Sequence, residues 1–247
     1  MMGKTTGITW ADATWNPWVG CTKVSSGCAN CYAEREMTRF GKDFNTINRS
    51  KTTFRDPLKW KTPKIIFVNS WSDFFHPDVP LHWVDDAWDI MMEADHHIYL
   101  LLTKRANNIK DALPLAWHLA KPPEHIWIGV TVEEWEYSHR LVALEEIEAS
   151  IKFVSIEPFL GPMPDLYSFF PSLDWVITGG ESGPGCRKLP LSWVRNIRDQ
   201  CVDYNIPFHH KQHGGTEKID GTWGGRELDG VIWDEMPPNR VQNGNRG

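Results

Sequence analysis

Ile151-Lys152-Phe153-Val154-Ser155-Ile156-Glu157-Pro158 is the stretch that indicates the architecture of this chain most directly. Its first six residues form a mostly apolar, β-branched run with the length of a buried strand. A carboxylate and a proline follow at once. Similar runs occur at 65–68, 98–102, 126–130, 175–178 and 206–208. Such runs are typical of strands that are buried on both faces of a parallel sheet.

Segments with the apolar spacing of amphipathic helices lie between these runs, at 81–92, 109–116, 141–147 and 194–202. Pro114 is expected to interrupt the second of them. Strands that alternate with helices predict right-handed βαβ units in one parallel sheet. With one more strand ahead of residue 21, we count about six or seven units. We therefore predict an α/β fold, a partial or full TIM-like (β/α) barrel, with a flat doubly wound sheet as the alternative.

The composition is that of a globular protein with a substantial core, since 41% of the 247 residues are hydrophobic and 23% are charged. No apolar run is long enough to span a membrane, and residues 1–14 lack the apolar segment of an export signal. We therefore expect a cytoplasmic protein. The formal net charge of −6 argues against a surface that coats nucleic acid non-specifically. Basic residues are nevertheless concentrated between Arg35 and Lys64.

No linker divides the chain. We expect a single domain over 1–237 whose last part is irregular from about residue 214, followed by a disordered tail over 238–247.

Three of the five cysteines lie together, in the stretch Gly20-Cys21-Thr22-Lys23-Val24-Ser25-Ser26-Gly27-Cys28-Ala29-Asn30-Cys31-Tyr32. The glycines and serines let this loop curl, so that the three sulfurs can converge. Residues 8–10 and 15–19 read as short extended pieces that lead into it, and residues 32–40 as a helix that follows it. Clustered cysteines in a chain without an export signal usually bind metal rather than form disulfides. Three thiolates are one short of a closed zinc site, so either a distant His or Cys186 completes it, or a cofactor or substrate fills the open position.

Polar side chains follow every predicted strand, at the edge where parallel α/β folds place their sites. They are Asn69 to Asp73, Thr103 to Arg105, Thr131 to Glu133, Glu157, Gly179 to Gly183 and His209 to His213. Neighbours on one strand point to opposite faces, so the histidines are not expected to form a metal site, whereas Lys211 or His213 is a candidate substrate contact. We predict one site that gathers these strand ends and the cysteine loop.

A cysteine loop after the first strand of a barrel, with an aromatic residue behind the last cysteine, resembles the radical SAM superfamily. The first gap, between Cys21 and Cys28, is longer than the usual one, whereas the gap before Cys31 is retained. Over roughly 8–237 the chain is also similar to the phage-encoded three-Cys-motif family, through residues 15–18, 69–73, 102–105, 156–158, 179–183 and 211–212. Ser72-Asp73 and Thr103-Lys104 are similar to the cofactor-binding elements of the spore photoproduct lyases, which act on thymine in DNA.

The resemblance implies a role for each motif. Cys21, Cys28 and Cys31 would hold a 4Fe–4S cluster, and S-adenosylmethionine would chelate its open iron. Ser72 and Asp73 would contact the methionyl ammonium, and Lys104 or Arg105 the carboxylate, with Thr103 in the same cofactor-binding element. The remaining candidates are Thr131 and Glu157 for the ribose, Gly179, Gly180 and Glu181 for the cofactor or substrate, and Cys186 as a hydrogen-atom donor. The structural alternatives are a helix cap at Ser72 or Asp73, a solvated Lys104, structural roles for Thr131 and Glu157, and an inert Cys186.

The same resemblance implies an enzyme in which the reduced cluster cleaves S-adenosylmethionine and a 5′-deoxyadenosyl radical abstracts hydrogen from a substrate. The expected substrate is a base in phage DNA or a nucleotide, with a free metabolite as the rival. An electron donor such as flavodoxin or ferredoxin and a location in the host cytoplasm are expected with it. The alternative function is a zinc-stabilised module that binds nucleic acid or protein without catalysis.

Overall fold

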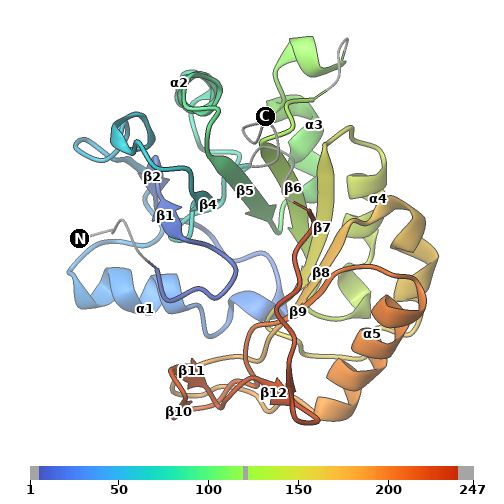
Figure 1. Cartoon of the computed structure of the whole chain (residues 1–247). Helices are drawn as coiled ribbons and strands as arrows, with labels where there is room; N and C mark the ends of the chain where they lie inside the picture. Colours follow the sequence, from blue (N-terminus) through green and yellow to red (C-terminus); the bar gives the residue numbers. More distant parts are fainter. Residues whose placement is uncertain (1–5, 119–121, 239–247) are drawn as a thin grey trace.

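A single parallel sheet of seven strands, in the order β1-β4-β5-β6-β7-β8-β9, forms the centre of the computed structural model, which describes residues 6–118 and 122–238. The strands are β1 Ala13–Trp15, β4 Ile65–Val68, β5 Ile98–Thr103, β6 Ile126–Thr131, β7 Ile151–Ile156, β8 Trp175–Thr178 and β9 Phe208–His210. Figure 1 shows this sheet curled into an open half-barrel with helices outside it. The predicted α/β partial barrel is confirmed. The flat doubly wound alternative is wrong, because such a sheet reverses its strand order and this one runs in chain order throughout.

The helices follow the predicted apolar spacing. They are α1 Tyr32–Arg39, α2 Leu81–Glu93, α3 Ile109–Ala112, α4 His139–Glu145 and α5 Leu191–Asp203. Helix α3 ends before Pro114, and only a short helical turn, Leu115–His118, follows. The last strand begins at Phe208 rather than at residue 206, because Pro207 has no N–H to give to the ladder.

Two apolar layers stabilise the half-barrel. The larger packs the helices against the outer face of the sheet. The smaller fills the inside of the half-barrel and includes Trp10, Phe67, Leu100, Trp127, Phe153, Trp175 and Ile177. Gly129 is required here, since a Cβ at that position would lie 2.5 Å from the Phe153 ring. The inner cluster therefore forms a solid floor beneath the ends of the strands.

Residues 8–10 connect the two sides of the open barrel. The Trp10 ring packs edge-on against Phe67 of β4 at 4.8 Å and against Trp175 of β8 at 6.4 Å between ring centroids. Next to it, the Thr9 hydroxyl lies 2.8 Å from Nε2 of His209 in β9. The expectation of an extended piece over 8–10 is wrong, because the chain turns here so that Trp10 can enter the interior.

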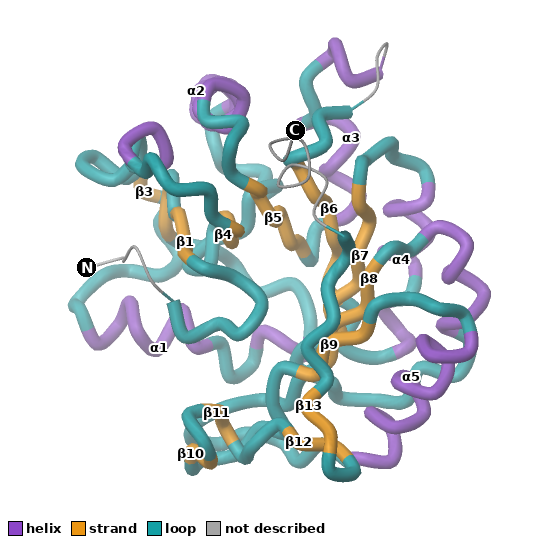
Figure 2. Tube along the Cα trace, viewed as in Figure 1, coloured by secondary structure: helices purple, strands orange, loops and turns teal. Residues whose placement is uncertain are grey.

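Three small two-stranded sheets complete the fold. β2 Trp18–Val19 pairs with β3 Asn48–Arg49, and two hairpins follow β9: β10 Lys218–Ile219 with β11 Thr222–Trp223, and β12 Glu227–Leu228 with β13 Val231–Ile232. Figure 2 shows both hairpins close to each other at the end of β9. The tail predicted to be disordered lies outside the described residues, apart from Pro238. In the part of the chain that is described, no helix is long and apolar enough to cross a membrane.

Candidate functional site

A cavity of about 190 Å³ lies at the carboxyl ends of the strands and is roofed by the cysteine loop. Most of the predicted site residues line it: Cys21, Cys28, Cys31, Ser72, Asp73, Lys104, Thr131, Glu157, Gly180 and Glu181. Thr103, Gly179 and Cys186 are not in its lining. The loop and the strand ends, far apart in the sequence, therefore share one site.

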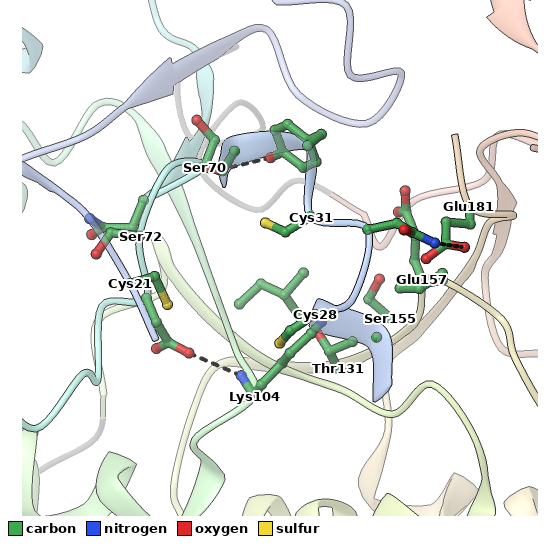
Figure 3. A pocket seen from close by; sticks show the side chains of 18 of the residues that line it. Cys21, Cys28, Cys31, Ser70, Ser72, Lys104, Thr131, Ser155, Glu157 and Glu181 are labelled. Carbon is green, nitrogen blue, oxygen red and sulfur yellow. Dashed lines mark hydrogen bonds between the residues drawn. The ribbon is translucent and has the colours of Figure 1, made fainter. Parts of the chain in front are cut away.

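The sulfurs of Cys21, Cys28 and Cys31 face a common space in Figure 3. All three are free thiols and half-buried. Burial raises the pKa of Cys21 to about 11 and also raises the pKa of Cys31. Among the described residues, no three His, Cys, Asp or Glu side chains gather tightly enough to hold one metal ion. In a 4Fe–4S cluster each thiolate binds its own iron, so three thiols placed around a shared cavity fit such a cluster by donor type and arrangement.

Three arginines hold the cysteine loop by its backbone, two from distant segments and one, Arg35, from the helix that follows the loop. Arg105 Nη2 donates to the Thr22 carbonyl at 2.9 Å, and Arg187 Nη2 to the Ser26 carbonyl at 3.0 Å. Arg35 Nη1 donates to the Asn30 carbonyl at 3.3 Å. We name Arg35, Arg105 and Arg187 the arginine clamp. Sequence reasoning missed it, because nothing in the spacing of these residues shows that they meet at one loop.

Asp73 supports the arginine clamp, and both of its carboxylate oxygens accept hydrogen bonds from the protein. One oxygen accepts from the Thr103 hydroxyl at 2.7 Å and from the Phe75 N–H at 3.0 Å. The other accepts from the Lys104 N–H and from Arg105 Nη1, each at 3.2 Å. Ser72, likewise, donates its hydroxyl to the Gly20 carbonyl. Both residues predicted to contact the methionyl ammonium are therefore engaged in shaping the loop.

Lys104 is paired inside the protein. Its Nζ lies 3.3 Å from the Glu133 carboxylate, which Arg140 Nη1 also contacts at 2.8 Å. The Ser25 hydroxyl of the cysteine loop donates to the same carboxylate. Burial alone would raise the pKa of Glu133, but the two cations lower it below its ordinary value, so the group is a carboxylate. A buried acid thus connects the loop with β5 and β6.

The Gly179-Gly180-Glu181 motif also serves the loop. Asn30 Nδ2 donates to Glu181 at 3.0 Å, and Arg187 donates to it from its backbone N–H at 2.8 Å and from its side chain. These hydrogen bonds outweigh burial and lower the pKa of Glu181. A Cβ on Gly180 would lie 1.9 Å from the His213 carbonyl oxygen. The backbone of residues 213 and 214 therefore occupies the space beside this glycine, so the protein itself makes the close approach there.

Asn69 presents an oxygen that nothing in the described protein binds. Its backbone is left-handed, with φ 60°, and its Nδ2 donates to the Trp18 carbonyl at 3.0 Å. Because a carbonyl only accepts, this bond fixes the orientation of the amide and leaves Oδ1 without a partner. Asn69 lines the cavity, and its Oδ1 is buried with no hydrogen bond among the described residues. Such an acceptor is available to a donor from a ligand or from water.

Residues 5–237 match the family model described as "Protein of unknown function (DUF5131)". The chain belongs to this family. No curated protein matches. Among solved structures, the chain is similar to spore photoproduct lyase complexed with dinucleoside spore photoproduct, with a TM-score of 0.49 and 14% identity over 77% of this chain and 61% of the other. A double mutant of that lyase with bound AdoMet and the same dinucleoside gives a TM-score of 0.49 and 12% identity over the same shares. The chain thus spans about three fifths of these proteins.

In this DUF5131 protein the far side of the cavity holds an ion pair. Lys211, just after β9, pairs with Glu157, just after β7, and both line the cavity. The two side chains are 16% and 19% exposed, so the pair is largely shielded but open to the cavity. Lys211, which the sequence offered as a substrate contact, is therefore placed where a ligand can reach it.

His210 and His213 of this family member belong to one hydrogen-bonded relay. The Thr178 hydroxyl lies 2.9 Å from Nδ1 of His210, whose Nε2 lies 2.9 Å from Nδ1 of His213. Nε2 of His213 lies 3.0 Å from the Glu227 carbonyl. Since that carbonyl only accepts, the whole relay is ordered, with Thr178 donating to His210, His210 to His213 and His213 to Glu227. The relay attaches the β12–β13 hairpin to the barrel.

The two remaining cysteines, Cys186 and Cys201, differ in burial and in position. Cys201 is buried in α5 within the outer core, and burial raises its pKa. Cys186 is half-buried in the turn between Gly183 and Arg187, outside the cavity lining.

Proposed function

We propose that this protein is a radical SAM enzyme, in which Cys21, Cys28 and Cys31 hold a 4Fe–4S cluster. The observation that supports this most is that three thiols of one short loop line the cavity at the carboxyl ends of a parallel half-barrel. No fourth cysteine of the described chain lines it, which leaves one iron of a cluster open for S-adenosylmethionine. When bound and reduced, the cluster supplies the electron that cleaves S-adenosylmethionine to methionine and a 5′-deoxyadenosyl radical.

The chain's own residues bind and orient the cofactor. Asn69 Oδ1, as a buried acceptor without a donor, is suited to the methionyl ammonium. Ser72, Asp73 and Thr103 do not contact the cofactor in this proposal. They hold the cysteine loop and Arg105 in position. Lys104 is the proposed partner of the methionyl carboxylate, with Glu133 keeping its ammonium in place. Thr131 and Glu157 are the proposed contacts of the ribose, with Gly179 packed beside Glu157 and Gly180 against the His213 carbonyl.

We propose different roles for Glu181 and Cys186. Glu181 is a positioning residue, because its oxygens are bound by Asn30 and Arg187. Cys186 as a hydrogen-atom donor would require the turn 183–187 to move, since the thiol is outside the cavity lining.

We propose a base in DNA or a nucleotide as the substrate, with an electron donor such as flavodoxin or ferredoxin. The basic stretch from Arg35 to Lys64 supports this less than its composition suggested. Arg49 pairs with Asp86 at 2.6 Å, and Lys59 with Asp56 at 2.8 Å. Charges neutralised in this way attract a phosphate backbone weakly. Support for a base comes instead from the cavity floor.

Metal analysis of anaerobically purified protein tests the cluster. We expect about four irons and four sulfides per chain with a brown absorbance. One zinc per chain, with no iron taken up on reconstitution, would overturn the proposal in favour of a zinc-stabilised binding module.

A further inference from the structure

The floor of the cavity carries a hydroxyl that has no partner. Ser155 lies in β7, with Thr131 of β6 and Ile177 of β8 as its neighbours across the sheet. Its side chain lines the cavity between Thr131 and Glu157, as Figure 3 shows. Ser155 is only 1% exposed, and its Oγ makes no hydrogen bond within the described chain. A buried hydroxyl left unpaired is costly, so a group from outside the protein is expected to bind it.

Lys211 brings a second donor to the same part of the cavity. Its ammonium is paired with Glu157, two residues beyond Ser155 on the chain, and retains two further N–H donors. Because Glu157 neutralises this charge, the pair as a whole is not a strong site for an anion. It is suited to a neutral acceptor such as a carbonyl oxygen.

Part of the cavity lining is apolar and aromatic. Trp10, Phe67 and Leu102 line the cavity and belong to, or pack against, the inner cluster. Aromatic and aliphatic faces of this kind pack well against a planar ring. A cavity that combines these donors with an apolar, partly aromatic lining is suited to a ligand that is flat, largely apolar on its faces and polar at its edge.

We infer that this floor binds a nucleobase through a ring carbonyl, with Ser155 Oγ and Lys211 Nζ donating to the carbonyl oxygen. The chemical class is a keto base, such as thymine, uracil, hypoxanthine or guanine, rather than adenine, which carries an amino group and no ring carbonyl. The assignment of this base as the substrate rests on the proposed function. The binding itself does not depend on radical chemistry.

Binding of a matched nucleoside pair tests the inference. The reconstituted protein is kept anaerobic with S-adenosylhomocysteine, which fills the cofactor's own nucleoside site, and is titrated with inosine or adenosine. Equilibrium dialysis gives both affinities. We expect inosine to bind about tenfold more tightly, the effect of one buried donor left unpaired by adenosine. Equal affinities, or no binding of either nucleoside, would overturn the inference.

Two variants test whether Ser155 and Lys211 cause the preference for inosine over adenosine. Ser155→Ala and Lys211→Met should each reduce the preference for inosine several-fold, whereas Ser168→Ala, an exposed serine, should keep it. If either folded floor variant retains the full preference, that residue is not a donor to the base. Cleavage of S-adenosylmethionine is measured separately on the wild type. Cleavage without a preference for inosine defeats only this inference, and a preference without an iron cluster defeats only the proposed function.

Discussion

Arg105 touches the sulfur of Cys21 and the carboxylate of Asp73 with the same nitrogen. Nη1 lies 3.5 Å from Cys21 Sγ and 3.2 Å from Asp73 Oδ2, and both charged side chains are only 7% exposed. The other terminal nitrogen of Arg105 holds Thr22 through its carbonyl and hydroxyl oxygens. Hydrogen bonds and charge next to a cluster thiolate raise the reduction potential of the iron, so Arg105 would tune the proposed cluster as well as shape the loop.

Replacing Arg105 should therefore change a property of the iron. We expect Arg105→Gln to bind the cluster with a lower midpoint potential and to lose iron to a chelator faster, because a cation and an N–H···S bond are removed. Redox titration followed by electron paramagnetic resonance measures the first effect. Arg55→Gln is the control, since Arg55 is 66% exposed and 3.8 Å from Glu93. An unchanged potential in an iron-loaded Arg105→Gln protein would limit Arg105 to a structural role.

Glu133 should matter for stability more than any acid on the surface. Its carboxylate is fully buried between Lys104 and Arg140. Glu133→Ala leaves two cations without their counterion, so we expect the free energy of unfolding to fall by about 3–5 kcal/mol, the usual cost of breaking a buried ion pair. Urea unfolding measures it. The exposed Glu136→Ala is the control and should change little. A loss below about 1 kcal/mol would mean that water already reaches the pair.

The histidine relay predicts a pH dependence of stability. Burial, followed by the charge of His213, lowers the pKa of His210 to about 3, whereas the unfolded chain has the ordinary value near 6.5. Between these values the unfolded state binds more protons, so the stabilisation is complete above pH 6.5 and is lost as the pH falls. His210 alone contributes a slope that approaches about 1.4 kcal/mol per pH unit.

His210→Gln should flatten that slope, because glutamine does not titrate. The free energy of unfolding is measured between pH 7 and pH 5 for the wild type, for His210→Gln and for the exposed control His139→Gln. Equal slopes in the wild type and His210→Gln would show that His210 is protonated in the folded protein.

The cysteines predict a sharp division in iron content. Alanine at Cys21, Cys28 or Cys31 should abolish assembly of the cluster, because two thiolates cannot hold it. Cys201→Ala should bind iron like the wild type, since Cys201 lies in α5 away from the cavity. Iron analysis and the visible spectrum after reconstitution decide this. A variant at one of the three positions that keeps its full iron content would remove that cysteine from the ligand set.

Local sequence patterns predicted the sheet well. The strand at Ile151–Ile156 and the strand at Trp175–Thr178 have the predicted bounds, because a continuous apolar run fits only the interior of a layered α/β fold. The polar residues after each strand also predicted where the cavity lies, since the ends of parallel strands meet at one edge.

What the sequence did not show is which polar group binds which. Asp73 looked like a ligand contact, yet the hydroxyl of Thr103 and the guanidinium of Arg105 reach it from the next strand. Ser155 looked like an ordinary strand residue, and only its burial without a partner distinguishes it. Such pairings depend on side-chain packing between segments far apart in the chain, which periodicity does not contain.

The most direct test of the central claim is the reductive cleavage of S-adenosylmethionine by the anaerobically reconstituted wild-type protein. With a strong reductant and no added substrate, we predict slow accumulation of 5′-deoxyadenosine and methionine, quantified by chromatography. The Cys28→Ala protein, treated in the same way, should form neither product. A wild-type protein that carries a full, reducible cluster and binds S-adenosylmethionine but releases no 5′-deoxyadenosine would contradict the account.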